Sequence, residues 1–332
     1  MEMKYLGRTG VKVSGLALGT MTFGAEANEE TSVALYRRAR EAGINFFDCA
    51  DVYAGGRSEE ILGRLVAAER DDVLLTSKAY FPTSEDPNAR GATRRHLSRS
   101  VERSLRRLGT DRLDVYFVHR FDDVTPLEDT LRALEDLVRS GKVLYLGASN
   151  FAAWQVAKGL GISAARGWNR FEVIQPMYNL VKRQAEVEIL PLAASEAIGV
   201  IPYSPLGGGL LTGKYAAAGG GASAEDRLVR NKMYATRYAG DDVQDAATRF
   251  AIFARERGWE PAALAVAWVA SHPAVTAPIL GARSAEQLEA SLGALDIPMT
   301  ADLRAEVSAL SPTPPPATDR NEEGTAFHYG AR

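Results

Sequence analysis

The sequence predicts one α/β domain folded as a (β/α)8 TIM barrel. Short apolar runs alternate with amphipathic segments about eight times along the 332 residues, and such alternation is typical of parallel βαβ units. Eight units imply closure into a barrel, which needs roughly 250 residues. No glycine- and serine-rich or charge-block linker occurs before about residue 311. We therefore expect a single domain over 1–332 whose last part, about 311–332, is a proline-rich tail.

The expected elements follow from the spacing of apolar residues. Two short alternating segments around a glycine-containing turn predict an N-terminal β-hairpin at 4–14. Buried strands are expected at about 16–19, 46–48, 73–78, 113–119, 143–149, 173–176, 199–203 and 276–279. Helices are expected at about 28–42, 58–68, 93–108, 126–140, 152–160, 186–197, 242–257 and 284–292, with one extra helix at 261–271.

The helical pattern is most regular at 93–108, where Leu97 and Val101 share one face and Arg95 and Arg99 share another. An arginine stripe opposite a leucine stripe is ordinary amphipathicity. We therefore prefer a solvated outer helix of the barrel to a nucleic-acid footprint.

Two segments interrupt the alternation of strands and helices. Residues 206–241 are rich in glycine, and a connection of that length is either functional or disordered. The tail contains Pro314, Pro315 and Pro316, which are incompatible with a helix or strand. Folding of this tail over the barrel and a loose tail are both open.

The composition narrows the class of protein. Hydrophobic residues make up 46% and charged residues 24%, as in ordinary globular proteins, and the net charge of −3 argues against a nucleic-acid binder. Cys49 is the single cysteine, so an intrachain disulfide and a cysteine-based zinc cluster are excluded and a cytoplasmic location is favoured. Neither a signal peptide nor a run of eighteen apolar residues occurs, so no membrane span is expected.

Four polar residues follow three consecutive predicted strands. Asp48 and Tyr53 come at and after the end of one strand, Lys78 ends the next, and His119 ends the third. In a parallel barrel the carboxyl ends of all strands open onto one mouth, so these side chains are expected to meet there.

These four side chains would form a proton-donating site for a carbonyl oxygen. A phenol is a poor acid at neutral pH, and the Lys78 ammonium is expected to lower the pKa of Tyr53. Asp48 would keep Lys78 charged and oriented, and His119 would donate a hydrogen bond to the oxygen gaining charge. Taken singly, each residue also has a structural interpretation. Asp48 could be a turn residue, and Tyr53 an aromatic at the rim of the barrel. Lys78 could belong to a surface ion pair, and His119 could be a buried, hydrogen-bonded histidine. A metal site is not expected, because no second ligand stands at suitable spacing.

Reduction also needs a hydride donor, and a nicotinamide cofactor can supply the hydride. No G-x-G-x-x-G follows the first strand, which argues against a Rossmann unit. Polar or flat side chains follow later strands instead and suit a carboxamide and a nicotinamide ring. They are Ser149, Asn150, Gln175 and the run Tyr203, Ser204, Pro205 and Leu206. After the eighth strand, Gly281 and Arg283 precede a helix whose first N–H groups suit a phosphate.

Six stretches resemble successive signatures of the aldo-keto reductase family, over nearly the whole chain. They read LALGTMTFG at 16–24, FDCADVY at 47–53, SEEILG at 58–63, GASNF at 147–151, QPMYN at 175–179 and YSPL at 203–206. Within the family the chain looks most similar to bacterial reductases and to members resembling potassium-channel β-subunits.

The resemblance implies a barrel that binds NADPH/NADP+ in an extended form, with Asp48, Tyr53, Lys78 and His119 as its catalytic tetrad. Gly19, Thr20 and Met21 would line the nicotinamide end together with Asp48. Ser149, Asn150 and Gln175 would hold the carboxamide, and Tyr203 would stack on the ring. Leu206, Gly208, Lys214 and Arg227 would wrap the pyrophosphate, while Arg283 and Gln287 would face the 2′-phosphate. Ala290 and Ser291 stand where relatives often have Glu-Asn, so the contact to adenine differs.

We therefore expect an NADPH-dependent reductase of an aldehyde or ketone, with a small-molecule carbonyl substrate that the sequence does not identify. One alternative is a slow-turnover, NADPH-binding redox-sensing or partner-binding subunit. Another, by analogy of fold alone, is a phosphate-sugar isomerase or lyase. The sequence indicates no oligomeric state. Specificity is expected in the loops of the mouth.

Overall fold

The computed structural model describes residues 1–215 and 226–327, apart from the side chains of Arg227, Glu323 and Gly324. Its centre is a parallel sheet of eight strands in the order β10-β3-β4-β5-β6-β7-β8-β9. The strands are β3 (Ala17–Gly19), β4 (Phe46–Asp48), β5 (Leu74–Ala79), β6 (Leu113–Val118), β7 (Val143–Ser149), β8 (Phe171–Gln175), β9 (Gly199–Val200) and β10 (Ile279–Leu280). Every neighbouring pair is parallel, which agrees with the barrel that the alternation predicts.

Backbone hydrogen bonds close the ring between β9 and β10. The amides of Thr276 and Ile279 donate to the carbonyls of Val200 (2.9 Å) and Pro202 (2.9 Å). The N–H of Val200 in turn donates to Oγ1 of Thr276 (3.1 Å). The strands predicted at 199–203 and 276–279 are therefore shorter in the structure, where they are β9 and β10. The residues next to them form the hydrogen bonds that close the barrel, and we call this join the seam.

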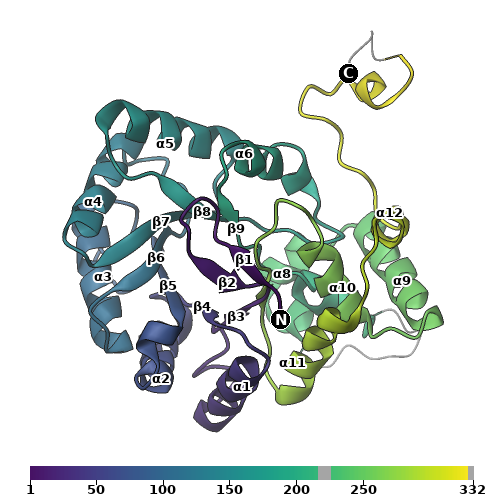
Figure 1. Cartoon of the computed structure of the whole chain (residues 1–332), viewed down its shortest axis with the longest axis horizontal. Helices are drawn as coiled ribbons and strands as arrows, with labels where there is room; N and C mark the ends of the chain where they lie inside the picture. The colour runs from purple at the N-terminus through teal and green to yellow at the C-terminus, as the bar shows by residue number, and fades with distance from the viewer. Residues whose placement is uncertain (216–225, 328–332) are drawn as a thin grey trace.

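Helices surround the sheet on its outside (Figure 1). They are α1 (Glu29–Glu41), α2 (Arg57–Val66), α3 (Arg94–Leu108), α4 (Leu127–Arg139), α5 (Ala153–Arg166), α6 (Ile189–Ser195), α7 (Arg227–Arg230), α8 (Lys232–Arg237), α9 (Asp241–Glu256), α10 (Pro261–Ala270), α11 (Ala285–Leu292) and α12 (Ala301–Ser308). Each of the nine predicted helices is present in this list. The short helices α7 and α8, and α12, are additions that the sequence pattern did not predict.

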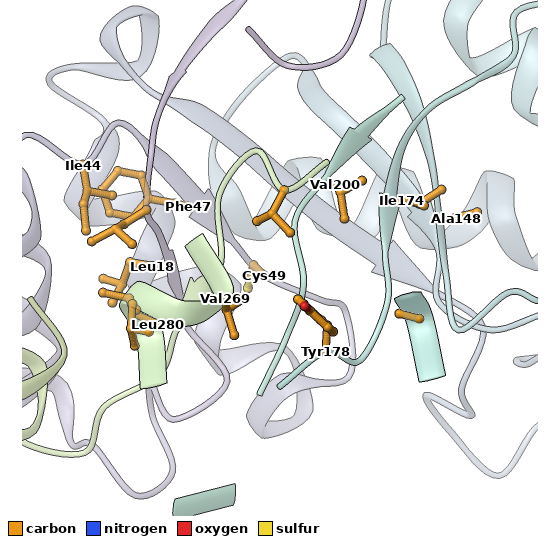
Figure 2. Close-up of a cluster of buried hydrophobic side chains, with 14 of the residues drawn as sticks. Leu18, Ile44, Phe47, Cys49, Ala148, Ile174, Tyr178, Val200, Val269 and Leu280 are labelled. Carbon is orange, nitrogen blue, oxygen red and sulfur yellow. The ribbon is translucent and has the colours of Figure 1, made fainter. Parts of the chain in front are cut away.

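Two hydrophobic layers hold the barrel together. The larger layer lies between the sheet and the outer helices, where Leu18, Phe47 and Val200 are fully or almost fully buried (Figure 2). The smaller layer fills the inside of the barrel with Phe46, Val115, Phe117, Val173 and other apolar residues. Because successive side chains of a strand point to opposite faces, each strand contributes to both layers.

The N-terminal hairpin of β1 (Met3–Tyr5) and β2 (Lys12–Ser14) covers the amino-terminal end of the barrel. Leu6 and Val13 are fully buried and belong to the inner layer. A Cβ atom on Gly7 would lie 2.5 Å from the amide nitrogen of Gly199, so only glycine permits this close approach. The hairpin therefore closes the end of the barrel opposite to the carboxyl ends of the strands.

Gly147 makes room for the ring of Phe117 inside the barrel. An added Cβ would lie 2.3 Å from Cδ1 of Phe117, so we expect Gly147→Ala to destabilise the protein by about 1–3 kcal/mol. Gly161→Ala, in the middle of α5, is the matched control because no atom lies within 4 Å of the added methyl group. It should stabilise the protein by about 0.5–1 kcal/mol. Urea unfolding of both variants measures the difference, and equal stabilities would contradict this packing.

Among the described residues, no helix is long and apolar enough to cross a membrane.

Candidate active site at the carboxyl end of the barrel

The four polar residues predicted to converge are neighbours at the mouth of the barrel. Asp48 ends β4, Lys78 lies near the end of β5 and His119 follows β6, while Tyr53 opens the short helix η1 (Tyr53–Gly56). Nζ of Lys78 lies 2.6 Å from Oδ2 of Asp48 and 3.3 Å from the hydroxyl oxygen of Tyr53. The rings of Tyr53 and His119 meet edge to face with centroids 6.1 Å apart.

Asp48 is the centre of a buried hydrogen-bond network. Its Oδ1 accepts from Oγ1 of Thr76 (2.7 Å) and from Nε2 of Gln175 (2.8 Å), while its Oδ2 accepts from Lys78. Thr76 is the residue directly opposite Asp48 in the pairing of β4 with β5. Three donors therefore surround this carboxyl group inside the barrel, and such hydrogen bonds offset the loss of water.

Lys78 is fully buried and keeps its charge. Burial alone would lower the pKa of its ammonium group, but the charges of Asp48 and Tyr53 outweigh burial and the pKa is raised. The group also donates to the backbone carbonyl of Cys49 at 2.7 Å. Its three donors therefore point at Asp48, Cys49 and Tyr53.

The prediction that Tyr53 is an unusually acidic phenol is wrong for this structure. Burial raises the pKa of Tyr53 and outweighs the lowering effect of Lys78, and with a smaller raising effect of Asp48 the pKa is about 12. Removing a phenolate from water costs more than one ammonium group recovers when that ammonium already serves a carboxylate. Tyr53 therefore holds its proton firmly at neutral pH.

His119 is buried and neutral. Burial, and to a lesser extent the charge of Lys78, lowers the pKa of its imidazole well below the ordinary range. Its Nδ1 atom is buried without a hydrogen-bond partner among the residues that the structure describes. The ring of Phe81 packs edge-on against it, with centroids 4.9 Å apart. An unpaired polar atom at the mouth of a barrel is a place where a substrate oxygen can bind.

The lowered pKa of His119 makes stability depend on pH. Below about pH 6.5 the unfolded chain binds a proton at this histidine and the folded chain does not, so stability falls as the pH decreases toward the folded pKa. In wild type this effect lowers the free energy of unfolding by up to about 1.4 kcal/mol per pH unit, and we expect His119→Gln to lack this decrease. Urea unfolding at pH 7 and 5.5 checks it. Parallel pH dependences of variant and wild type would contradict a neutral buried imidazole.

The residues expected to hold a carboxamide form one chain of hydrogen bonds. Oγ of Ser149 donates to the carbonyl of Gln175 (3.0 Å), and Nδ2 of Asn150 donates to the carbonyl of His119 (2.9 Å). The hydroxyl of Tyr203 donates to Oδ1 of Asn150 (2.7 Å). Gln175 directs its Nε2 at Asp48, so this amide nitrogen supports the carboxylate.

Positive φ angles mark the same region of the backbone. Asn150 and Ser204 both adopt φ of 57°, and Ala54 next to Tyr53 adopts 48°. Side chains rarely adopt this conformation, and such positions cluster at functional sites. The buried Pro205 and the half-buried Leu206 continue the turn from Ser204 into the short helix η4 (Gly207–Thr212).

The first strand also ends at this mouth. Oγ1 of Thr20 donates to the carbonyl of Asp48 (3.1 Å) and accepts from the hydroxyl of Ser58 (2.9 Å). A Cβ atom on Gly19 would lie 2.6 Å from Cγ2 of Ile279, so glycine allows close packing at this point of the ring. Met21, which follows, is partly exposed.

The expected phosphate contacts lie on two segments. Gly208 has φ of 68° within η4, and Lys214 pairs with Asp226 at 2.5 Å. The side chain of Arg227 lies outside the described residues. At the start of α11, Ser284 accepts from the amide of Gln287 (3.4 Å), and Oε1 of Gln287 accepts from the amide of Arg283 (3.0 Å).

Gly281 and Ser291 differ in how much they present to a ligand. Gly281 is exposed before α11. Ser291 is 1% exposed, and its hydroxyl donates to the carbonyl of Gln287 (3.2 Å). The Ser291 hydroxyl therefore serves the helix itself.

Thr76 is a part of the site that the sequence reasoning missed. It stands two residues before Lys78 in β5, and the two-residue period of a strand places both side chains on the inner face. Phe117 stands in the same relation to His119, and its ring centroid lies 6.0 Å from Nζ of Lys78. Strand period alone could have identified both residues.

The mouth of this parallel barrel thus carries a buried lysine–carboxylate pair within hydrogen-bond distance of a phenol. Residues 15–312 match the family model described as "Aldo/keto reductase family". The chain therefore belongs to the aldo/keto reductase family and is an NAD(P)H-dependent oxidoreductase.

Three relatives span nearly the whole chain. An uncharacterized oxidoreductase, YrpG, of Bacillus subtilis is 36% identical over 95% of this chain and 97% of its own. A probable voltage-gated potassium channel subunit beta of Oryza sativa is 36% identical over 96% and 99%. An L-glyceraldehyde 3-phosphate reductase of Escherichia coli is 33% identical over 89% and 88%.

Proposed function

We propose that the protein reduces an aldehyde or ketone to an alcohol with NADPH, reversibly, and that Tyr53 gives the carbonyl oxygen its proton. The observation that carries this proposal is the 3.3 Å contact between Nζ of Lys78 and the hydroxyl of Tyr53, with Lys78 buried against Asp48. A fully buried ammonium at hydrogen-bond distance from a phenol stabilises the phenolate that remains after proton transfer.

The proton donor is a protonated phenol throughout the resting state. When bound, the reduced nicotinamide supplies the hydride to the carbonyl carbon. As negative charge develops on the oxygen, this oxygen becomes more basic than a phenolate and takes the proton of Tyr53. A neutral His119 can donate an N–H to the same oxygen, and Lys78 neutralises the phenolate. The pKa of about 12 for Tyr53 suits this order of events, because the proton leaves only when an alkoxide forms.

The described residues fit a nicotinamide dinucleotide. Asn150 and Tyr203 would hold the nicotinamide end beside Asp48, and Lys214 with the N-terminus of α11 would hold the phosphates. A Cβ on Gly208 would lie 2.9 Å from Cδ1 of Tyr234, so the backbone of η4 runs close to α8.

The test is consumption of NADPH by the purified protein with a panel of aldehydes and ketones that ranges from short aliphatic to aromatic compounds. We expect carbonyl-dependent oxidation with one alcohol formed per NADPH, and the reverse reaction with alcohol and NADP+. If no carbonyl compound accelerates the loss of NADPH above the rate without substrate, the proposal is wrong.

Arg283 is proposed to select NADPH over NADH. Loss of one charge-assisted contact to the 2′-phosphate corresponds to roughly a 10–100-fold weaker affinity. We therefore expect Arg283→Gln to raise KM for NADPH by this factor and to leave KM for NADH nearly unchanged. Arg166→Gln is the control, because Arg166 on α5 pairs with Glu128 on α4 and neither helix is proposed to contact the cofactor. Equal changes with both cofactors would contradict the role of Arg283.

A second candidate is a subunit that binds NADPH tightly, turns over slowly and reports redox state to a partner. It is favoured by the relatives named as potassium channel subunits beta. Single-turnover and steady-state rates separate the two: a sensor reduces its first carbonyl much faster than it completes later cycles, because release of the cofactor limits it.

A further inference from the structure

Asp51 is a buried carboxyl group that the proposed reaction does not use. It lies two residues before Tyr53, is 3% exposed and donates its amide to the carbonyl of Lys78 (3.1 Å). Neither of its carboxyl oxygens has a hydrogen-bond partner among the described residues. A buried polar group without a partner carries a free-energy cost that a bound ligand or water removes.

The carboxyl group of Asp51 lines a pocket of about 150 Å³ beside the tetrad. The wall of this pocket comes from three segments: the chain around η1, the loop after β5, and one face of α3. Its lining residues are Asp51, Val52, Gly55, Pro82, Thr83, Ser100, Arg103 and Arg107. Oγ1 of Thr83 is a second buried atom here without a partner among the described residues.

The charges around the pocket favour an anion accompanied by a proton. Arg107 pairs with Glu59 (2.5 Å), which is fully buried, so these two charges cancel. Arg103 adds one positive charge, and no ion pair links it to another residue within the described part of the chain. The wall thus carries a charge of about +1 when Asp51 is protonated and about 0 when it is ionised. An anion without a proton of its own is attracted only in the first case, whereas an anion with an O–H group can donate to the ionised carboxylate.

We propose that this pocket binds a small oxyanion that retains an acidic proton, of the hydrogen phosphate class. The O–H of the ligand donates to Asp51, while Arg103, Thr83 and Ser100 donate to its other oxygens. A fully ionised oxyanion such as sulfate has no proton to offer, so it is repelled once Asp51 is ionised, whereas hydrogen phosphate still brings its own proton. A metal cation is disfavoured by the two guanidinium groups.

The environment of Asp51 allows its carboxyl group to share one proton with the bound anion. Burial, and then the charge of Glu59, raises its pKa to about 7, against the lowering effect of Arg107. The charged and titratable groups facing it are Glu59 on α2, Arg103 and Arg107 on α3, Lys78 on β5 and Tyr116 on β6. Binding of an anion without a proton should therefore weaken as the pH rises above 7, because Asp51 then lacks its proton, whereas hydrogen phosphate still supplies one.

Isothermal titration calorimetry with inorganic phosphate and with sulfate tests the proposal. The full chain is first saturated with NADP+, so that the proposed contacts to cofactor phosphates are filled. At pH 8.5, where Asp51 is ionised, we expect phosphate to bind roughly 10–100-fold more tightly than sulfate, the factor that one hydrogen bond to a charged group supplies. Absence of phosphate binding, or equal affinity for both anions, would overturn the proposal.

Two variants and one control assign the binding to this pocket. Asp51→Asn should abolish the preference for phosphate over sulfate and flatten the pH dependence, because an amide donates to either anion. Arg103→Gln should weaken phosphate by about tenfold or more. Arg99→Gln, an exposed arginine on the same helix that does not line the pocket, should change nothing. If phosphate binds these three variants and the wild type equally, it binds elsewhere and the proposal fails.

Discussion

Replacing Tyr53 by phenylalanine is expected to lower kcat for carbonyl reduction by roughly 10²–10⁴-fold, the range that general acid catalysis contributes. The variant loses only the hydroxyl group that lies 3.3 Å from Nζ of Lys78. Without it no proton donor stands next to the developing alkoxide. Binding of NADPH should persist, because the residues proposed to hold the cofactor are unchanged. Steady-state rates and a fluorescence titration of NADPH measure the two quantities.

Tyr145→Phe is the matched control for this variant. Tyr145 lies on β7 and packs against the inner layer of the barrel, away from the tetrad. Its loss of a hydroxyl should leave kcat nearly unchanged. If Tyr53→Phe and wild type reduce the same aldehyde at similar rates, another group supplies the proton and the assignment of Tyr53 is lost.

Replacing Lys78 by methionine is expected to destabilise the fold as well as abolish activity. The change leaves Asp48 ionised and buried with only two neutral donors, Thr76 and Gln175. Removing one partner of a buried ion pair costs about 3–5 kcal/mol. Urea unfolding gives the stability, and NADPH oxidation gives the activity.

The double variant Asp48→Asn/Lys78→Met separates the two effects. An amide and a thioether carry no charge, so most of the lost stability should return, as it does when both members of a buried pair are replaced by neutral groups. Activity should not return, because Tyr53 still lacks its cation. If the double variant is no more stable than Lys78→Met, the lost stability has a cause other than an unpaired carboxylate.

The raised pKa of Lys78 makes the stability of the fold depend on pH in alkaline solution. Because the folded pKa exceeds the ordinary value of 10.5, the contribution of this ion pair is fully present below about pH 10 and is lost as the pH rises through the folded pKa. Wild type should therefore lose stability in alkali more steeply than the double variant.

The positions of the tetrad residues could be predicted because they depend on two simple properties. Parallel strands end on one side of a barrel, and Asp48, Lys78 and His119 each stand at or near a strand end. The acidity of Tyr53 could not be predicted, since it depends on how far the hydroxyl lies from water and on which partner uses the charge of Lys78. The bond from Gln175 to Asp48 was missed for a related reason. Sequence places a side chain on a face but does not choose among its partners.

The helix boundaries illustrate another limit. Helix α5 continues to Arg166, although the helical pattern predicted an end near residue 160. Gly159 lies within this helix and packs against Phe171 of β8. An added Cβ would be 2.8 Å from Cε2 of Phe171, so a larger residue would not fit at this position. Helix α12 was missed because its short sequence follows Pro298 and lacks a strong apolar stripe. A glycine can end a helix at a turn, or it can allow close packing within a helix, and the sequence alone does not distinguish these two roles.

The seam of the barrel lies next to one part of the site and away from the other. Between β9 and β10 the ring is held by a few backbone amides and the Thr276 hydroxyl, and these two strands are not neighbours in a ladder, so the cylinder can part at this join at low cost. Tyr203 and η4 adjoin that join, whereas Asp48, Lys78 and Tyr53 lie farther round on β4, β5 and η1. Brief parting at the join would let a bound dinucleotide escape while the proton donor keeps its geometry.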